Sequence, residues 1–174
     1  MKAKRHNDPL DTLGSAYEQM YEHLVNDIHQ LKEKSGPAIN KLIEQVKQKA
    51  IQLEEISEHE AEQLTEWLKR DLDDAANYLN KTQNELKDWL GFETALLENA
   101  VLDLLLKTAD STTVKLIKLK EQAQAPYTYR TGEITIAGTL VCDNCGENLH
   151  FYKAGKIPPC PKCHKVSYHR IWQS

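Results

Sequence analysis

The chain has 174 residues, of which 28% are charged and only 7% are aromatic, and its formal net charge is −4. This length suits one helical domain with a small appended module, and such a composition is typical of long, solvated helices. The sequence holds no run of 18 apolar residues, and no apolar stretch follows its basic amino terminus. We therefore expect no membrane span and no signal peptide, and we predict a cytoplasmic protein.

The charge is divided unevenly along the chain. Residues 1–125 hold 16 Lys and Arg against 23 Asp and Glu, a balance of −7, whereas residues 126–174 hold 6 against 3, a balance of +3. The sequence predicts an acidic, coiled-coil-like helical domain over residues 10–125 and a second domain over residues 126–174.

Two amphipathic helices open the first domain. Apolar residues recur at steps of three and four from Leu10 to Leu31, and again from Ile39 to Leu53, as on one face of a helix. Gly36-Pro37 is expected to end the first helix. We expect the second helix to turn back antiparallel to the first.

A capping box predicts the start of a third helix, because Ser57 and Glu60 have the spacing at which each side chain can satisfy a free backbone amide. About 30 residues of helix would make a rod roughly 45 Å long. Such a rod needs partner helices from this chain or from another copy. Trp67 and Trp89 beside its apolar stripe would mark either a partner surface or ordinary packing, and packing is the commoner case.

A fourth and a fifth helix complete the predicted domain. After a break at Gly91-Phe92, residues 93–109 form the most apolar helix, which is the expected centre of a bundle. Residues 110–113 could cap a last short helix through Val114 and Ile117, and Pro126 closes the helical part.

Beyond Pro126 the apolar period becomes alternating, as in strands. Residues 134–142 suggest one strand with a bulge at Ala137-Gly138, and residues 149–152 and 166–169 are further short strands. Gly155 is expected at the turn between the two cysteine pairs. The sequence thus predicts a long antiparallel helical hairpin or bundle followed by a small C-terminal β module.

All the cysteines lie in two Cys-x-x-Cys pairs, Cys142 with Cys145 and Cys160 with Cys163, separated by fourteen residues. In a reducing compartment this spacing indicates metal ligands rather than disulfides. Four thiolates suit one structural Zn²⁺ in a tetrahedral site, and iron is the less expected metal. The predicted fold class is therefore mainly α, a long antiparallel helical hairpin or bundle followed by a small C-terminal β zinc ribbon. We predict no other cofactor and no catalytic residue.

Three other interpretations of the cysteines are weaker. Residues 160–164 match the haem-attachment pattern Cys-x-x-Cys-His, but that chemistry needs export. A redox dithiol needs a strand-helix setting, and catalytic zinc keeps one position open for water. His164 and His169 are expected to be surface residues.

Since the sequence shows no phosphate loop and no pairing of a nucleophile with a base, we predict that the protein is not an enzyme.

Aromatic and basic side chains interleave near the carboxyl terminus and could stack nucleic-acid bases. They are Phe151, Tyr152, Lys153, Lys156, Tyr168, His169, Arg170 and Trp172. The alternative, a miniature core with solvated lysines, is favoured because a metal-loaded site would leave the domain near neutral. Nucleic-acid contact would use Lys153, Lys156, Tyr168 and Arg170.

The sequence resembles the YbeL-like zinc-ribbon-containing proteins, a bacterial family of unknown function. The resemblance is carried by YEHL at residues 21–24, LKRDLDDA at residues 68–75, YRTGEITIAGTLVCDNCG at residues 129–146 and the second pair CPKC. It runs from about Tyr17 to Arg170. It implies the same four cysteine ligands and no established activity.

These features together predict a non-enzymatic zinc-binding protein that serves as a macromolecular interaction module. Its expected partner is a protein or a second copy of the chain, contacted through the helices. The alternatives are a nucleic-acid-associated factor, a helical oligomerisation scaffold and a redox-responsive or metal-responsive protein.

Overall fold

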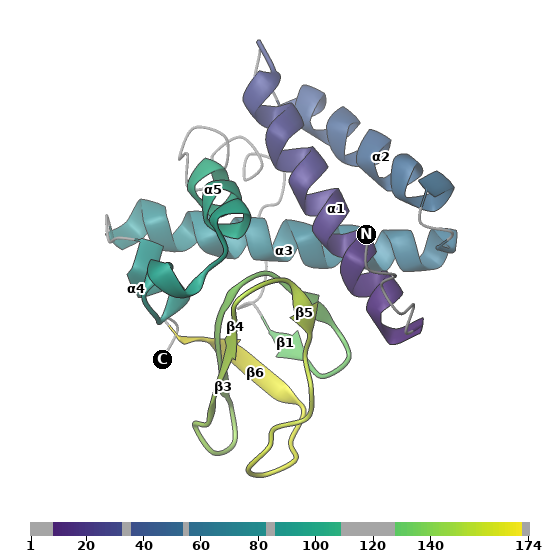
Figure 1. Ribbon diagram of the computed structural model, residues 1–174. Coiled ribbons are helices and arrows are strands. Elements are labelled where there is room, and N and C mark those ends of the chain that lie inside the picture. Colours follow the sequence, from purple (N-terminus) through teal and green to yellow (C-terminus); the bar gives the residue numbers. More distant parts are fainter. Residues whose placement is uncertain (1–8, 33–35, 54–55, 83–85, 109–127, 172–174) are drawn as a thin grey trace, which may run out of the picture.

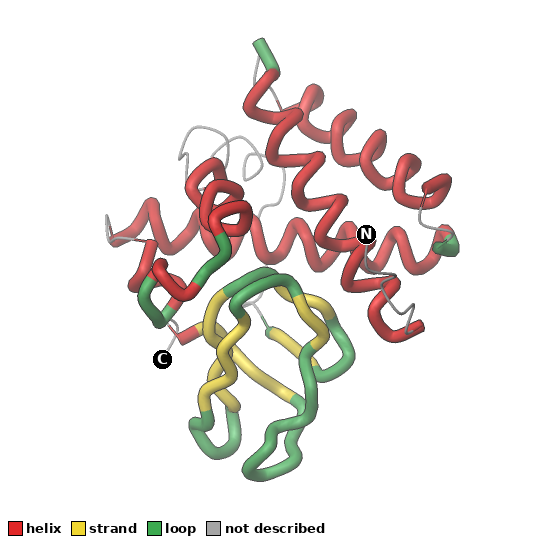
Figure 2. The backbone as a smooth tube through the Cα atoms, in the orientation of Figure 1, coloured by secondary structure: helices red, strands yellow, loops and turns green. Residues whose placement is uncertain are grey.

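Helices occupy the first part of the chain and strands the last part (Figures 1 and 2). The computed structural model describes residues 9–32, 36–53, 56–82, 86–108 and 128–171. The helices are α1 (Pro9–Gln30), α2 (Gly36–Leu53), α3 (Glu58–Thr82), α4 (Leu86–Leu90), the 3₁₀ helix η1 (Thr94–Leu96) and α5 (Asn99–Thr108). The strands are β1 (Tyr129–Arg130), β2 (Ile134–Thr135), β3 (Gly138–Cys142), β4 (Asn148–Phe151), β5 (Gly155–Lys156) and β6 (Ser167–Arg170). The predicted fold class is confirmed.

The first two helices form the predicted hairpin, with their apolar stripes facing each other and α3. Gly36-Pro37 does not end α1, which stops at Gln30, but begins α2. A proline suits this place because the first residues of a helix have no partner for their N–H groups. Leu53, at the end of the predicted stripe, is 62% exposed.

The third helix begins at the predicted capping box. The backbone N–H of Ser57 donates to Glu60 Oε2 at 2.8 Å, and the backbone N–H of Glu60 donates to Ser57 Oγ at 3.2 Å. From there α3 crosses α1 at a steep angle and packs against α1, α2, α4 and α5 (Figure 1). The described helices therefore form a bundle rather than an extended rod.

The fourth apolar stretch contributes to the core but is not the single helix that was expected. Its described residues, 93–108, divide into η1 and α5, with Leu97 buried in the core and Leu96 58% exposed. Fully covered side chains also come from α1 and α3, among them Tyr17, Leu24 and Leu64. The expected last helix through Val114 and Ile117 lies outside the described residues.

The strands form two small antiparallel sheets. One has the order β1-β6-β3-β4, and the other pairs β2 with β5. The expected single strand over residues 134–142 is wrong, because Ala137-Gly138 is a corner at which the chain passes from the second sheet to the first. Gly138 has φ +144°, which favours glycine. Gly155 is not a turn residue but belongs to β5.

The strands lie along one side of α3, where β2 also contacts α1 and β3 contacts α4, whereas α2 and α5 lie on the other side of α3 (Figure 1). Ile134, Ile136 and Ala137 from the β part belong to the same buried cluster as the helical core. The predicted division at residues 125 and 126 falls within residues 109–127, which the structure does not describe. None of the described helices is both long enough and apolar enough to cross a membrane.

Candidate functional site

The two cysteine pairs are held in two turns of the same construction. In the first, the N–H of Gly146 donates to the Cys142 carbonyl at 3.0 Å, and in the second the N–H of His164 donates to the Cys160 carbonyl at 2.9 Å. Gly146 and His164 occupy equivalent places, and both have positive φ, +73° and +60°. His164 is therefore a turn residue, and its exposed side chain lies outside the cluster of sulfur atoms.

These turns bring the four sulfur atoms together. All lie within 4.8 Å of one another, with Cys142 Sγ 3.5 Å from Cys163 Sγ and Cys145 Sγ 3.6 Å from Cys160 Sγ. A zinc ion with Zn–S bonds near 2.3 Å at tetrahedral corners would space its sulfurs by about 3.8 Å. None of the four cysteines forms a disulfide bond. The geometry thus fits one metal ion.

The electrostatics of the cluster also favour a cation. A backbone N–H at Lys165 helps to lower the pKa of the Cys163 thiol to about 6. A similar N–H at Glu147 favours the Cys145 thiolate, yet the other three sulfurs contribute to raising the pKa of Cys145 to about 12. Four crowded thiols resist full ionisation unless a positive charge compensates them, which a divalent metal does.

Comparison with known proteins identifies the module. Residues 26–171 match the family described as "Zinc-ribbon containing domain". The chain belongs to this family. The resemblance found in the sequence is thereby confirmed, and the zinc-ribbon domain together with the Cys₄ cluster supports a zinc-binding module.

Relatives of this zinc-ribbon protein occur in Escherichia coli. The chain is similar to "Uncharacterized protein YbeL" of strain K12, with 24% identity over 152 residues that cover 87% of this chain and 94% of the relative. The YbeL proteins of strains CFT073 and O157:H7 match to the same extent. No solved structure matches the chain.

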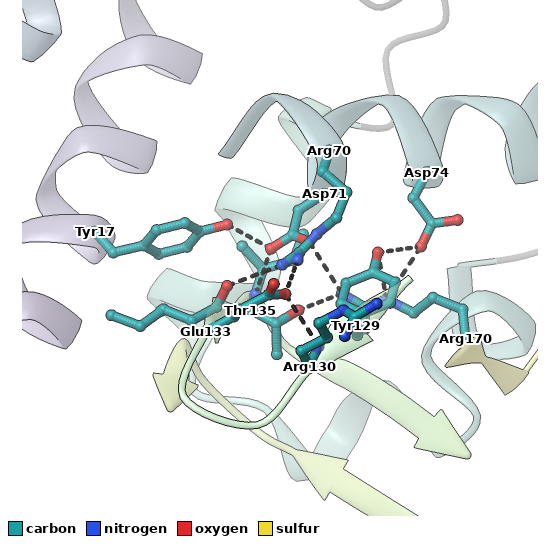
Figure 3. Close-up of polar contacts among 11 residues, drawn as sticks. Tyr17, Arg70, Asp71, Asp74, Tyr129, Arg130, Glu133, Thr135 and Arg170 are labelled. Atoms are coloured by element: carbon teal, nitrogen blue, oxygen red, sulfur yellow. Dashed lines mark hydrogen bonds and ion pairs between the residues drawn. The ribbon is translucent and has the colours of Figure 1, made fainter. Parts of the chain in front are cut away.

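A second group of residues, missed by the sequence analysis, joins the ribbon to the helices. We call it the docking network, and it consists of Tyr17, Arg70, Asp71, Asp74, Tyr129, Glu133, Thr135 and Arg170 (Figure 3). Asp71, Asp74 and Arg170 have no exposed surface.

Asp74 of α3 forms one half of this network. Its Oδ2 accepts hydrogen bonds from Tyr129 Oη at 2.6 Å and from Arg170 Nε at 3.1 Å. The Arg170 guanidinium also donates to Thr135 Oγ1 at 2.8 Å and lies 4.8 Å from the centre of the Trp89 ring. Burial opposes the charge of Arg170, but Tyr129 and the two aspartates raise its pKa, so it stays ionised.

Asp71 and Arg70 form the other half. Asp71 Oδ2 accepts from Tyr17 Oη at 2.5 Å and from the backbone N–H of Ile136 at 3.0 Å. Burial raises the pKa of Tyr17, and the Asp71 carboxylate raises it further. Arg70 pairs with Glu133 and donates to the Ile134 carbonyl at 3.0 Å. Apart from the hydrogen bond from Tyr17, these contacts join α3 to residues 133–136, which precede β3.

Of the four residues predicted for nucleic-acid contact, Lys153 and Lys156 are exposed, whereas Tyr168 and Arg170 are completely buried. Tyr168 donates to the Pro158 carbonyl at 2.7 Å, so neither it nor Arg170 is free to stack on a base. Among the other aromatic residues, Tyr152 is 46% exposed and contacts Phe92, with 4.9 Å between ring centres.

Three further expectations concern single side chains. His169 is half-buried, and its Nδ1 lies 2.5 Å from Asp143 Oδ1, so it is held within the ribbon surface. Trp89 is fully buried and Trp67 packs against the core, so packing is their role. Trp172 lies outside the described residues.

Proposed function

We propose that the protein is a non-enzymatic zinc-binding protein whose ribbon and helices together present one interaction surface. The observation that carries this proposal is the cluster of four sulfur atoms within 4.8 Å of one another. Cys142, Cys145, Cys160 and Cys163 would supply all four ligands of one zinc ion. The free thiols suit a reducing compartment such as the cytoplasm.

The nature of the ligands favours a structural rather than a catalytic zinc. Four thiolates fill a tetrahedral shell, whereas catalytic zinc keeps a position for water or substrate. A polar groove of about 630 Å³ between α2 and α3 has a lining of Glu, Lys, Asn, Ile and Thr side chains. Lys47 and Glu44 in that lining pair with each other at 3.0 Å, as oppositely charged residues one turn apart on a helix commonly do.

The proposed partner is a protein, which includes a second copy of this chain. The described ribbon turns two of its would-be base-stacking and phosphate-binding side chains, Tyr168 and Arg170, into its interior. The exposed cations of the ribbon are Arg130, Lys153, Lys156, Lys162 and Lys165. The acidic side chains of residues 126–174 and the four metal-bound thiolates would offset most of this charge, so little net positive charge would remain to neutralise phosphates. We therefore infer that the helices and the ribbon together bind a protein rather than a nucleic acid.

Metal analysis and binding assays test this proposal. Purified full-length protein is expected to contain one zinc ion per chain, and Cys145→Ser is expected to lose it together with the ordered ribbon. Titration with single-stranded RNA, single-stranded DNA and duplex DNA at two salt concentrations is expected to show no salt-sensitive binding. Micromolar binding that weakens with salt and is abolished by Lys153→Glu with Lys156→Glu would contradict the choice of a protein partner.

A further inference from the structure

One strand of the ribbon contacts both the cysteine cluster and the helices. Side chains two residues apart on a strand share a face, so Tyr168 and Arg170 of β6 point to the same side of the sheet. Tyr168 packs in a buried cluster with Cys142 and Cys160. Arg170, on the same strand, is the residue that reaches Asp74 of α3.

The cysteine end of this strand is fixed by several contacts. Cys142 of β3 is paired with Tyr168, and the Tyr168 hydroxyl donates to Pro158, two residues before Cys160. Without a metal to hold the two turns together, a module with so small an apolar core has little to keep β3 and β6 in register. The position of β6 thus depends on the cysteine cluster.

The helical end of the same strand depends on that register. A shift of β6 moves Arg170 away from Asp74 and Thr135, and it moves Tyr129, which pairs with Tyr168, away from Asp74 as well. Arg170, Asp74 and Tyr129 are fully buried, so a half-broken network leaves charges without partners in the interior. Such a network is stable when complete and is lost as a unit.

We propose that zinc binding at the cysteine cluster controls whether the ribbon is docked on α3, with β6 as the mechanical link between the two sites. This inference rests on the proposed structural zinc and extends it, since it gives the metal a role beyond the ribbon itself. Loss of zinc releases the docking network and uncovers the part of the helical core that Ile134, Ile136 and Ala137 now cover. The uncovered face of α3 carries Arg70, Asp71 and Asp74.

Hydrogen exchange of the full-length protein, with zinc and after treatment with a zinc chelator, tests the link directly. Backbone amides of α3 over residues 64–76 are expected to lose protection together with those of residues 128–171. The amides of α2 serve as an internal reference, because α2 packs against α1 and α3 and is expected to keep its protection. The proposal is overturned if α3 keeps its protection while the ribbon loses it, or if α2 exchanges as fast as α3.

Zinc affinity gives a second test, since coupling between two sites acts equally in both directions. Asp74→Asn lies outside the metal cluster, yet it is expected to weaken zinc binding by roughly 5- to 150-fold in competition with a coloured chelator. The matched control is Glu66→Gln, the same change at an exposed position of the same helix. Equal zinc affinity in the two variants would refute the link. The proposed structural zinc site would not be contradicted by that result, because the zinc content of both proteins is measured separately.

Discussion

Replacement of Asp74 by alanine is expected to destabilise the fold strongly, although this residue lies outside the cysteine cluster. The carboxylate is completely buried and accepts hydrogen bonds from Tyr129 and Arg170. Asp74→Ala removes both bonds and leaves the Arg170 guanidinium buried without its nearest anion. Breaking a buried ion pair from one side costs about 3–5 kcal/mol, most of it from the charge that remains.

This cost is large enough to be read from thermal unfolding. For a protein of this size, 1 kcal/mol corresponds to about 2–4 °C, so the melting temperature should fall by roughly 6–20 °C. Far-UV circular dichroism reports the helices. With Trp67 and Trp172 replaced by phenylalanine in both variants, the fluorescence of Trp89, whose ring centre lies 4.8 Å from the Arg170 guanidinium carbon, reports the interface. Glu66→Ala, at an exposed position of α3, should change stability by less than about 0.5 kcal/mol. Equal melting temperatures for the two variants would show that the network does not stabilise the fold.

Three further predictions concern other parts of the chain. Gly138 and Gly132 both have positive φ, but a methyl group added at Gly138 would meet Arg170, whereas the space around Gly132 is open. Gly138→Ala should therefore lower the melting temperature more than Gly132→Ala. Similar losses would mean that only backbone strain destabilises the two variants. Burial and Asp71 raise the pKa of Tyr17, so its contribution to stability is present below the ordinary tyrosine value of about 10 and is lost above it. The chain has seven tyrosines, so phenolate absorbance is compared between the protein and its Tyr17→Phe variant. The difference due to Tyr17 should appear only as the protein unfolds, and a difference that precedes unfolding would be contrary evidence. The hydrogen bond from the Ser57 N–H lowers the pKa of Glu60. The stability that Glu60 gives to the start of α3 is therefore present above the ordinary glutamate pKa and is lost as the pH falls through the lowered pKa. An NMR titration in which Glu60 shows the ordinary glutamate pKa would contradict this.

The cysteine cluster and most helices could be predicted because their signals are local. Two Cys-x-x-Cys turns need only a few residues each, and the capping box at Ser57 and Glu60 is complete within four positions. The buried stripe of α1 follows from helical periodicity alone, since apolar residues recur along it every three or four positions.

The docking network could not be predicted in this way, because its partners are far apart in the sequence. Arg170 and Asp74 are separated by 96 positions, and each has the local pattern of a solvated residue. The stretch LKRDLDDA in α3 is typical of an exposed charged helix face, yet Asp71 and Asp74 within it are buried by the ribbon. Alternation along β6 does place Tyr168 and Arg170 on one face, but only the presence of Asp74 explains why that face is the interior.

Two short strands and one corner were missed for a related reason. β1 and β5 have two residues each, which is too few to show a period. β2, also of two residues, was merged with β3 into one predicted strand. The corner at Ala137-Gly138 has the local appearance of a bulge, and the two sheets that it connects are defined by pairing with β5 and β6, later in the chain.

X-ray absorption at the zinc edge, measured on the purified full-length protein together with its metal content, tests the central claim most directly. One zinc ion per chain with four sulfur neighbours at about 2.3 Å is the expected result, and it would establish Cys142, Cys145, Cys160 and Cys163 as a closed structural site. A first shell that contains nitrogen or oxygen, or a folded protein that binds no metal, would contradict the claim.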